Sequence, residues 1–286
     1  MATDFFSIIQ ATGSSLWVSF QILGISALAF GFIALLVKGG EAITAARRAA
    51  AEIRVNLGIW VFDVIFVAPL LTVLIVMTRR AVGASFPVLV PEEFWNLGTY
   101  GTFVAVLFIG DFISWGRHRL EHSRLLWPTH AIHHSDENMT WLTLVRFHPL
   151  NRITTGCIDT GCLVLFGFPE WALVANVMFR HYYGEYIHAD LPWTYGPLGR
   201  VFVSPVMHRW HHARDVVGAG SNFATVFSVF DQAFGTYYVP GLCTVPLGVS
   251  DEMGHGVRGQ LAYPFVAWRH RFVAWSSSWR GARSQH

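Results

Sequence analysis

Residues 111–137 read DFISWGRHRLEHSRLLWPTHAIHHSDE and hold five of the chain's fourteen histidines. A later stretch, HRWHH at residues 208–212, adds three more in the same spacing. Histidines three or four residues apart lie on one side of a helix, so each cluster is expected to aim its imidazoles together. Eight convergent imidazoles exceed the four or so ligands of one zinc ion, and they suit two ions of Zn, Cu, Fe or Ni. The predicted ligands are His118, His122, His130, His133, His134, His208, His211 and His212.

Helix-start signals precede the two clusters with HxxHH spacing, HAIHH at residues 130–134 and HRWHH at residues 208–212. Pro128 and Pro205 suit the first turn of a helix, and Ser204 is a good N-cap residue. Each of these clusters is therefore predicted to lie on the first turns of a short helix.

The composition is that of an integral membrane protein. Of the 286 residues, 53% are hydrophobic and only 13% are charged, against about 25% charged residues in soluble domains. The net charge of +2 gives no reason to expect a nucleic-acid partner. The three cysteines form neither a zinc-type pair nor a disulfide framework.

Apolar segments predict an all-α fold with about four to five membrane spans. Residues 16–37, 57–78 and 97–116 are each long enough to cross a bilayer. Residues 152–187 are divided at Pro169 into two apolar arms, which we interpret as a helical hairpin. The N-terminal residues lack the basic segment of a cleaved signal peptide, so the first span is expected to remain as an anchor.

Basic residues predict the orientation of these spans. The loop between the first two spans carries four of them, which places it in the cytoplasm and the three histidine clusters on the cytoplasmic face. Arg79 and Arg80 oppose this orientation. Residues 190–286 are expected to form a cap with loops, and the tail from Trp268 either lies on the headgroup surface or is solvated or disordered. The expected domains are an anchor at 1–96, a catalytic domain at 97–240 and a C-terminal cap and tail at 241–286.

Four further residues are candidates for the site. Asp111 lies on the same helix face as His118, where its carboxylate is expected to accept a hydrogen bond from a metal-bound imidazole or to bond a neighbouring helix. His188 is a candidate ninth ligand and His181 a weaker one. His148, in RFHP, is expected to support the site or the fold rather than to bind metal.

These motifs resemble the fatty acid hydroxylase/sterol desaturase superfamily of membrane diiron enzymes. The resemblance covers roughly residues 100–240: the quoted stretch, then RFHP, IHAD, HRWHH and FDQAFGTYY. It implies that the eight histidines and His188 hold two iron ions, that O2 is the co-substrate and that Asp231 packs near the site. The sequence departs from the family at SNFAT, where members often have an NYG-like segment, which leaves the substrate subgroup open.

The resemblance implies hydroxylation of an unactivated C–H bond of a membrane lipid, and desaturation by the same centre is the alternative. A membrane metal-binding or transport protein is the rival of a different class. The chain shows no dinucleotide fingerprint and no HPGG haem motif, so a separate ferredoxin or cytochrome b5-like donor is expected. We expect it to dock on the cytoplasmic face among Arg117, Arg119, Arg124 and Arg209. The sequence does not define an oligomeric state.

Overall fold

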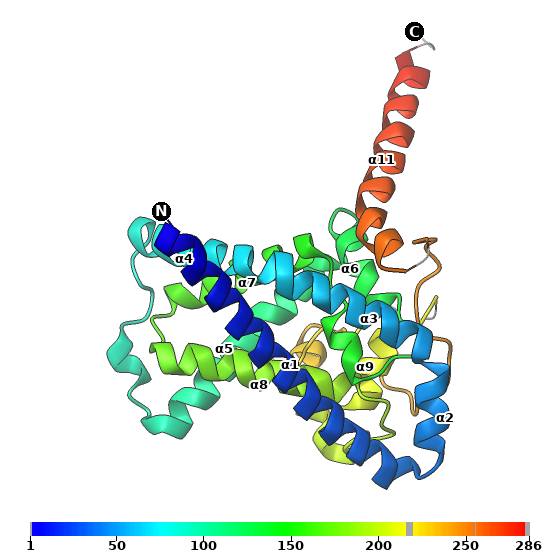
Figure 1. The fold of residues 1–286 in the computed structure, drawn as a ribbon, viewed down its shortest axis with the longest axis horizontal. Helices are drawn as coiled ribbons and strands as arrows, with labels where there is room; N and C mark the ends of the chain where they lie inside the picture. Colours follow the sequence, from blue (N-terminus) through cyan, green and yellow to red (C-terminus); the bar gives the residue numbers. More distant parts are fainter. Residues whose placement is uncertain (1, 216–219, 255, 284–286) are drawn as a thin grey trace.

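The computed structural model describes residues 2–215, 220–254 and 256–283, and this part of the chain is helical with no β-strand (Figure 1). The expected all-α class is confirmed. Two isolated bridges, Phe202 with Phe227 and Ala213 with Leu247, are the extended pairings that the structure records. Both join loops of the cap rather than forming a sheet.

Three helices are long and apolar enough to cross a membrane: Trp17–Lys38, Ala50–Ser85 and Gly98–Glu121. The first belongs to α1 (Ala2–Lys38) and the last is α5 (Gly98–Glu121). They lie where the sequence predicts the first three spans. A short amphipathic helix, α2 (Glu41–Arg48), joins α1 to the second span.

The second span is much longer than the predicted 57–78. It joins α3 (Ala50–Phe62) to α4 (Ala68–Ser85) through a π-helical turn at Asp63–Val67, so the helix does not end at Asp63, which is half-buried. Asp63 receives a hydrogen bond of 3.1 Å from Arg152 on α7, which offsets the cost of a carboxylate among apolar residues.

The segment expected to form a hairpin is two helices, α7 (Pro149–Leu165) and α8 (Glu170–His188), which both pack against α5. The chain turns between them at Gly167, whose φ of 62° favours glycine, and at the extended Pro169. The helix break is where the sequence predicts it. By length and composition neither helix is a candidate span, and a membrane crossing by this pair stays a prediction.

The cap consists of short helices connected by loops. They are α6 (Trp127–His134), a 3-10 turn at Trp141–Val145, a 3-10 turn at Gly196–Arg200, α9 (Pro205–His211) and α10 (Val229–Ala233).

A buried core joins the helices that carry histidines. Trp115 of α5, Ile187 of α8, Met207 of α9 and Phe223 of the following loop pack together. Ile187 and Met207 are 0% and 1% exposed, and burial of such a side chain stabilises a fold by roughly 1.5–3 kcal/mol. A second core sets Ile59 of α3 against α6, so the second span also supports the cap.

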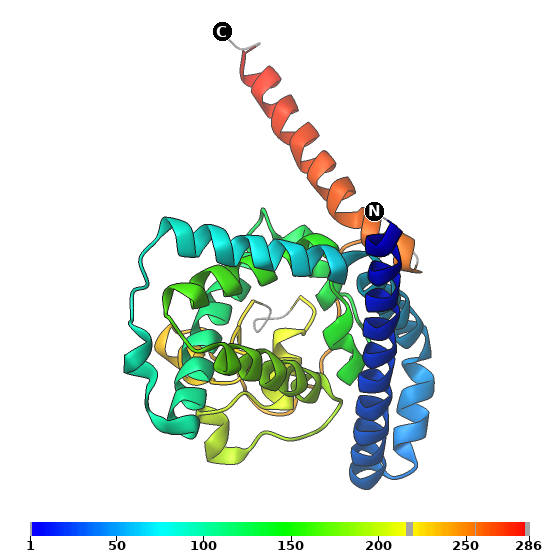
Figure 2. The ribbon, with the colours of Figure 1, turned by 60° about the vertical axis from the view of Figure 1, so that its left-hand side comes forward.

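The expected loops are present up to residue 254, whereas the expectation of a disordered tail was wrong for the described C-terminal residues; a place on the headgroup surface stays a prediction. These residues form α11 (Gly256–Arg283), whose last turns extend away from the rest of the molecule (Figures 1 and 2). Pro264 lies inside this helix instead of ending it. Tertiary bonds hold its first half: Trp268 donates to the Leu125 carbonyl oxygen at 2.9 Å, and Arg271 donates to that of Arg124.

Gly167→Ala is predicted to destabilise the protein by roughly 2 kcal/mol or more. A left-handed conformation costs an alanine roughly 1–2 kcal/mol, and the new Cβ would lie 2.4 Å from the Val90 carbonyl oxygen. Gly83→Ala is the control, because a Cβ there meets no atom within 4 Å and α4 gains about 0.5–1 kcal/mol. Thermal unfolding of the two variants in detergent checks this, and equal midpoints would contradict it.

Candidate metal centre

Four helices bring nine histidines together. α5 ends at His118 and His122, α6 carries the second cluster, α8 ends at His188, and α9 with its C-cap carries the third cluster. The predicted helix starts are confirmed: Pro128 and Pro205 lie in the first turns, and Ser204 Oγ accepts the Met207 N–H at 3.1 Å.

The nine side chains form two groups, and within each group one possible ligand atom per residue lies within 4.8 Å of all the others. The five-histidine group is His118, His122, His130, His134 and His211, and the four-histidine group is His133, His188, His208 and His212. The rings of His134 and His212 stack at 4.3 Å and so place the groups side by side. These nine residues are the nine that the sequence nominates as ligands.

Ring nitrogens face each other at short distances within both groups. His130 Nε2 lies 3.0 Å from His118 Nε2 and 3.1 Å from His134 Nε2. His188 Nε2 lies 2.9 Å from His208 Nε2 and 3.0 Å from His133 Nε2. Two nitrogens bound to one ion at about 2.1 Å are separated by roughly 3 Å, so this spacing fits a shared metal.

Backbone carbonyls fix which nitrogen of the ring carries the proton. The Nδ1–H groups of His118, His188 and His211 donate to the carbonyl oxygens of Phe223, Gly184 and Ser221 at 2.8, 2.6 and 2.6 Å. Their Nε2 atoms therefore carry lone pairs that point into the groups. These lone pairs are available to bind a metal ion.

Several buried ring nitrogens have no hydrogen-bond partner. They include Nε2 of His122 and His211 and both ring nitrogens of His212. Buried polar atoms are nearly always satisfied, so a set of orphaned nitrogens beside these lone pairs fits metal ligation. The residues present therefore suit two metal ions.

Burial also keeps these imidazoles neutral. It lowers the pKa of His211 to about 4 and holds the pKa values of His130, His133, His134, His208 and His212 well below the ordinary value. Neutral imidazole is the form that binds metal. At neutral pH protons do not compete with metal at these nitrogens.

Asp231 supports the site through a loop at residues 221–227. Its carboxylate accepts the N–H groups of Phe223 at 2.8 Å and Ala224 at 3.0 Å, and also the indole N–H of Trp115 at 3.0 Å. This loop supplies the carbonyl oxygens that orient His118 and His211. Asp231 thus positions two imidazoles without touching them.

Asp111 differs from its predicted role. It accepts the N–H groups of Thr225, Val226 and Phe227 at 3.2, 3.0 and 2.7 Å, and it does not bond an imidazole. Seven residues correspond to a rise of about 10 Å along a helix, so Asp111 and His118 share a face but reach different neighbours. Asp111 therefore holds residues 225–227 of this loop, and Asp231 holds residues 223 and 224.

Sequence reasoning missed a polar network behind His130. The buried Glu121 accepts hydrogen bonds from Asn151 at 2.7 Å and from Arg117 at 2.7 Å, and it lies 3.7 Å from His130 Nδ1. Arg117 and Glu121 are four residues apart on one helix, and this spacing was the sequence signal that could have predicted their ion pair.

Asn222 was also missed. Its φ is 59° and its amide donates to the carbonyl oxygens of Met207 and Tyr238 at 3.0 and 2.7 Å. It therefore ties the loop to α9. It lies in SNFAT, the segment that departs from the family pattern.

The remaining candidates lie outside both histidine groups. His148 caps α7: its Nδ1 accepts the Leu150 N–H, and its Nε2 donates to the Leu261 carbonyl oxygen, each at 3.2 Å. His181 is 41% exposed and lies 3.5 Å from Glu185. Arg117 is only 9% exposed and pairs with Glu121 and Asp159, so it is not the surface docking residue that the sequence suggested.

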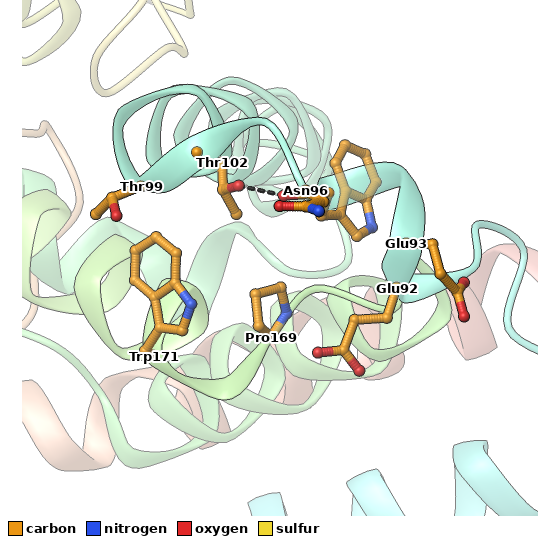
Figure 3. Close-up of a pocket in the computed structure, with 9 residues that line it drawn as sticks. Glu92, Glu93, Asn96, Thr99, Thr102, Pro169 and Trp171 are labelled. Carbon is orange, nitrogen blue, oxygen red and sulfur yellow. Dashed lines mark hydrogen bonds between the residues drawn. The ribbon is translucent and has the colours of Figure 1, made fainter.

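A separate hollow of about 520 Å³ lies at the opposite end of α5, with Glu92, Thr102 and Trp171 among its lining residues (Figure 3). No histidine lines it, so it is not part of the metal centre.

Comparison with known proteins identifies the segment that builds the site. Residues 103–236 match the family model of the fatty acid hydroxylases, and all nine histidines lie inside the match. Over these residues the chain is similar to the fatty acid hydroxylases. The resemblance inferred from the histidine motifs is confirmed.

The chain has curated relatives in bacteria and animals. Ornithine lipid hydroxylase OlsE of Rhizobium tropici is 29% identical over 66% of this chain and 62% of its own length. Alkylglycerol monooxygenase of Caenorhabditis elegans is 31% identical over 48% of the chain and 27% of its own length, and the human enzyme is 29% identical over 63% and 38%. The chain thus spans less than two thirds of these relatives. No solved structure matches it.

Asp231→Asn is predicted to lower metal affinity by roughly 10–100-fold, because loss of the charge loosens the loop that orients His118 and His211. Metal per chain, measured by mass spectrometry of the elements after dialysis at graded chelator concentrations, checks this. Glu252→Gln, a neutralised exposed carboxylate, is the control. Equal metal retention by the two variants would show that the loop does not position the imidazoles.

Proposed function

We propose that this protein is a membrane-embedded diiron hydroxylase, which inserts one oxygen atom from O2 into an unactivated C–H bond of a lipid. The observation that carries the proposal is the pair of adjacent histidine groups inside the segment that matches the fatty acid hydroxylases. The expected catalytic region, 97–240, contains the matched residues. The nine histidines are the proposed ligands.

Iron is the metal that this chemistry requires, because it would supply the activation of O2 when bound. The five-histidine group and the four-histidine group would each hold one ion. The chain contributes orientation, through the carbonyl acceptors behind the imidazoles. It also excludes water: Phe147 stacks on His133 at 4.5 Å, and Trp127 lies 5.1 Å from His122.

The relatives favour a lipid substrate and hydroxylation. Their names give ornithine lipid hydroxylation and alkylglycerol monooxygenation, both with amphipathic lipids that stay in a membrane. Desaturation by the same centre is the alternative outcome. A metal transporter must exchange its ions, whereas eight of the nine imidazoles are buried, which supports a resident centre.

Electrons would come from a separate ferredoxin or cytochrome b5-like protein. Arg119 and Arg124 are exposed and could attract such an acidic partner, whereas Arg209 is only 19% exposed and pairs with Asp190. We place this face, and the metal centre, on the cytoplasmic side, following the basic residues between the first two spans.

The first test measures iron per chain and records Mössbauer spectra of the protein. The second supplies 18O2 to membranes that contain the protein and searches their lipids for one labelled oxygen atom. Wild type is expected to hold two irons. His211→Ala in the five-histidine group and His133→Ala in the four-histidine group are each expected to lower labelled product roughly 100-fold or more.

His270→Ala, at an exposed histidine on α11, is the control that should keep iron and product. A single tightly bound zinc with no iron would overturn the oxygenase proposal. A lipid that loses two hydrogens and gains no oxygen would establish desaturation instead.

A further inference from the structure

A cavity of about 530 Å³ lies between α1, α2 and the cap, within the size range of small-molecule sites. Arg209 of α9 is one of the lining residues. One wall is apolar. It includes Phe30, Ile33, Leu35, Ile53, Met139 and Leu142. We call this cavity the α1 pocket.

The α1 pocket is charged at one end. Lys38 and Arg209 both pair with the carboxylate of Asp190, the latter at 3.2 Å. Arg48 and Glu137 also line the pocket, and each has its own partner elsewhere, Glu41 and Arg214 respectively.

Two cations therefore share one carboxylate. Lys38 and Arg209 are 18% and 19% exposed, so much of each side chain is removed from water, whereas Asp190 is 43% exposed. One positive charge at this end has no anion within the pocket. A phosphate or carboxylate group would complete the pairing with charge-assisted hydrogen bonds.

The charged end adjoins the metal centre. Asp190 follows His188 by two residues, and Arg209 directly follows His208 on α9. Both histidines belong to the four-histidine group. A molecule held by Lys38 and Arg209 would thus lie against the elements that carry these two imidazoles.

The apolar wall identifies the kind of molecule. α1 contributes Phe30, Ile33 and Leu35 to the pocket and is itself a candidate membrane span. A free inorganic anion would gain nothing from this wall, whereas a lipid would place its acyl chains along α1 and its headgroup on the cations.

We propose that the α1 pocket binds the anionic headgroup of a membrane lipid and presents that lipid to the metal centre as substrate. Lys38 and Arg209 bind the phosphate or carboxylate, and the α1 wall receives the adjoining chain. The assignment of the lipid as substrate rests on the proposed hydroxylase function, whereas binding in the pocket does not.

The binding test uses the full chain in detergent and native mass spectrometry with phosphatidylglycerol and diacylglycerol of the same acyl chains. Wild type is expected to retain phosphatidylglycerol about tenfold better. Lys38→Gln is expected to remove most of that preference. Arg47→Gln, at an exposed residue of α2 that does not line the pocket, should keep it.

A steric pair tests the wall independently of charge. Gly31 lines the α1 pocket and Gly24 does not, yet a Cβ at either position of α1 meets no atom within 4 Å. Gly31→Phe is expected to lower retention of phosphatidylglycerol about tenfold by filling the pocket, and Gly24→Phe to leave it unchanged. This pair stays informative if Lys38→Gln fails to fold.

Equal retention of the two lipids by wild type, or unchanged retention by both Lys38→Gln and Gly31→Phe, would overturn the proposal. Displacement of the lipid by millimolar inorganic phosphate would show a free-anion site and would overturn it too. Iron content and 18O2 incorporation are measured on the same preparations. If 18O2 is incorporated but the protein does not prefer phosphatidylglycerol, the proposed lipid site in the α1 pocket alone is refuted. If the protein binds phosphatidylglycerol selectively but holds no iron or inserts no oxygen, the hydroxylase proposal and the role of the bound lipid as substrate are refuted.

Discussion

The fold depends on gathering nine imidazoles in one place, with ring nitrogens of neighbouring rings only about 3 Å apart and the lone pairs of three rings directed inward by backbone carbonyls. Such an arrangement is unfavourable in itself, because buried ring nitrogens without a hydrogen-bond partner are costly in a dry interior. The protein maintains it with groups behind the rings: carbonyl oxygens that fix the tautomers and apolar side chains that restrict the helices. A bound cation would satisfy these nitrogens.

The loop at residues 221–227 shows how the support is built. It has no regular secondary structure of its own, and two buried carboxylates, Asp111 from α5 and Asp231 from α10, take up five of its N–H groups. Burial of an acid in this setting is tolerated only because backbone donors surround it. The carbonyls of the same loop are then free to accept imidazole protons. The two carboxylates therefore position the histidine ligands indirectly, through the peptide groups of this loop.

Much of this centre could be predicted from the sequence, because its signals are local. The spacing of three or four residues within each cluster sets a common helix face, and Pro128, Pro205 and Ser204 mark where the short helices begin. The division into five and four could not be predicted, because it depends on how α9 crosses α6. Asp111 was assigned to the wrong partner for the same reason: a shared helix face does not say which segment packs against it. α11 was missed because its first half is held by tertiary contacts, such as the bond from Trp268 to Leu125, which no local sequence pattern predicts.

Each histidine group draws on three helices, and both α6 and α9 contribute to the two groups. This arrangement determines the order of assembly. During synthesis α5 and α6 emerge first with an incomplete set of imidazoles, and neither group is complete until residues 205–212 have been made and have docked. Metal must therefore enter after the membrane helices and the cap are in place, through a body that is already folded. Before that point the early imidazoles are exposed to whichever divalent ion is most available, so a complete group of ligands exists only in the docked protein.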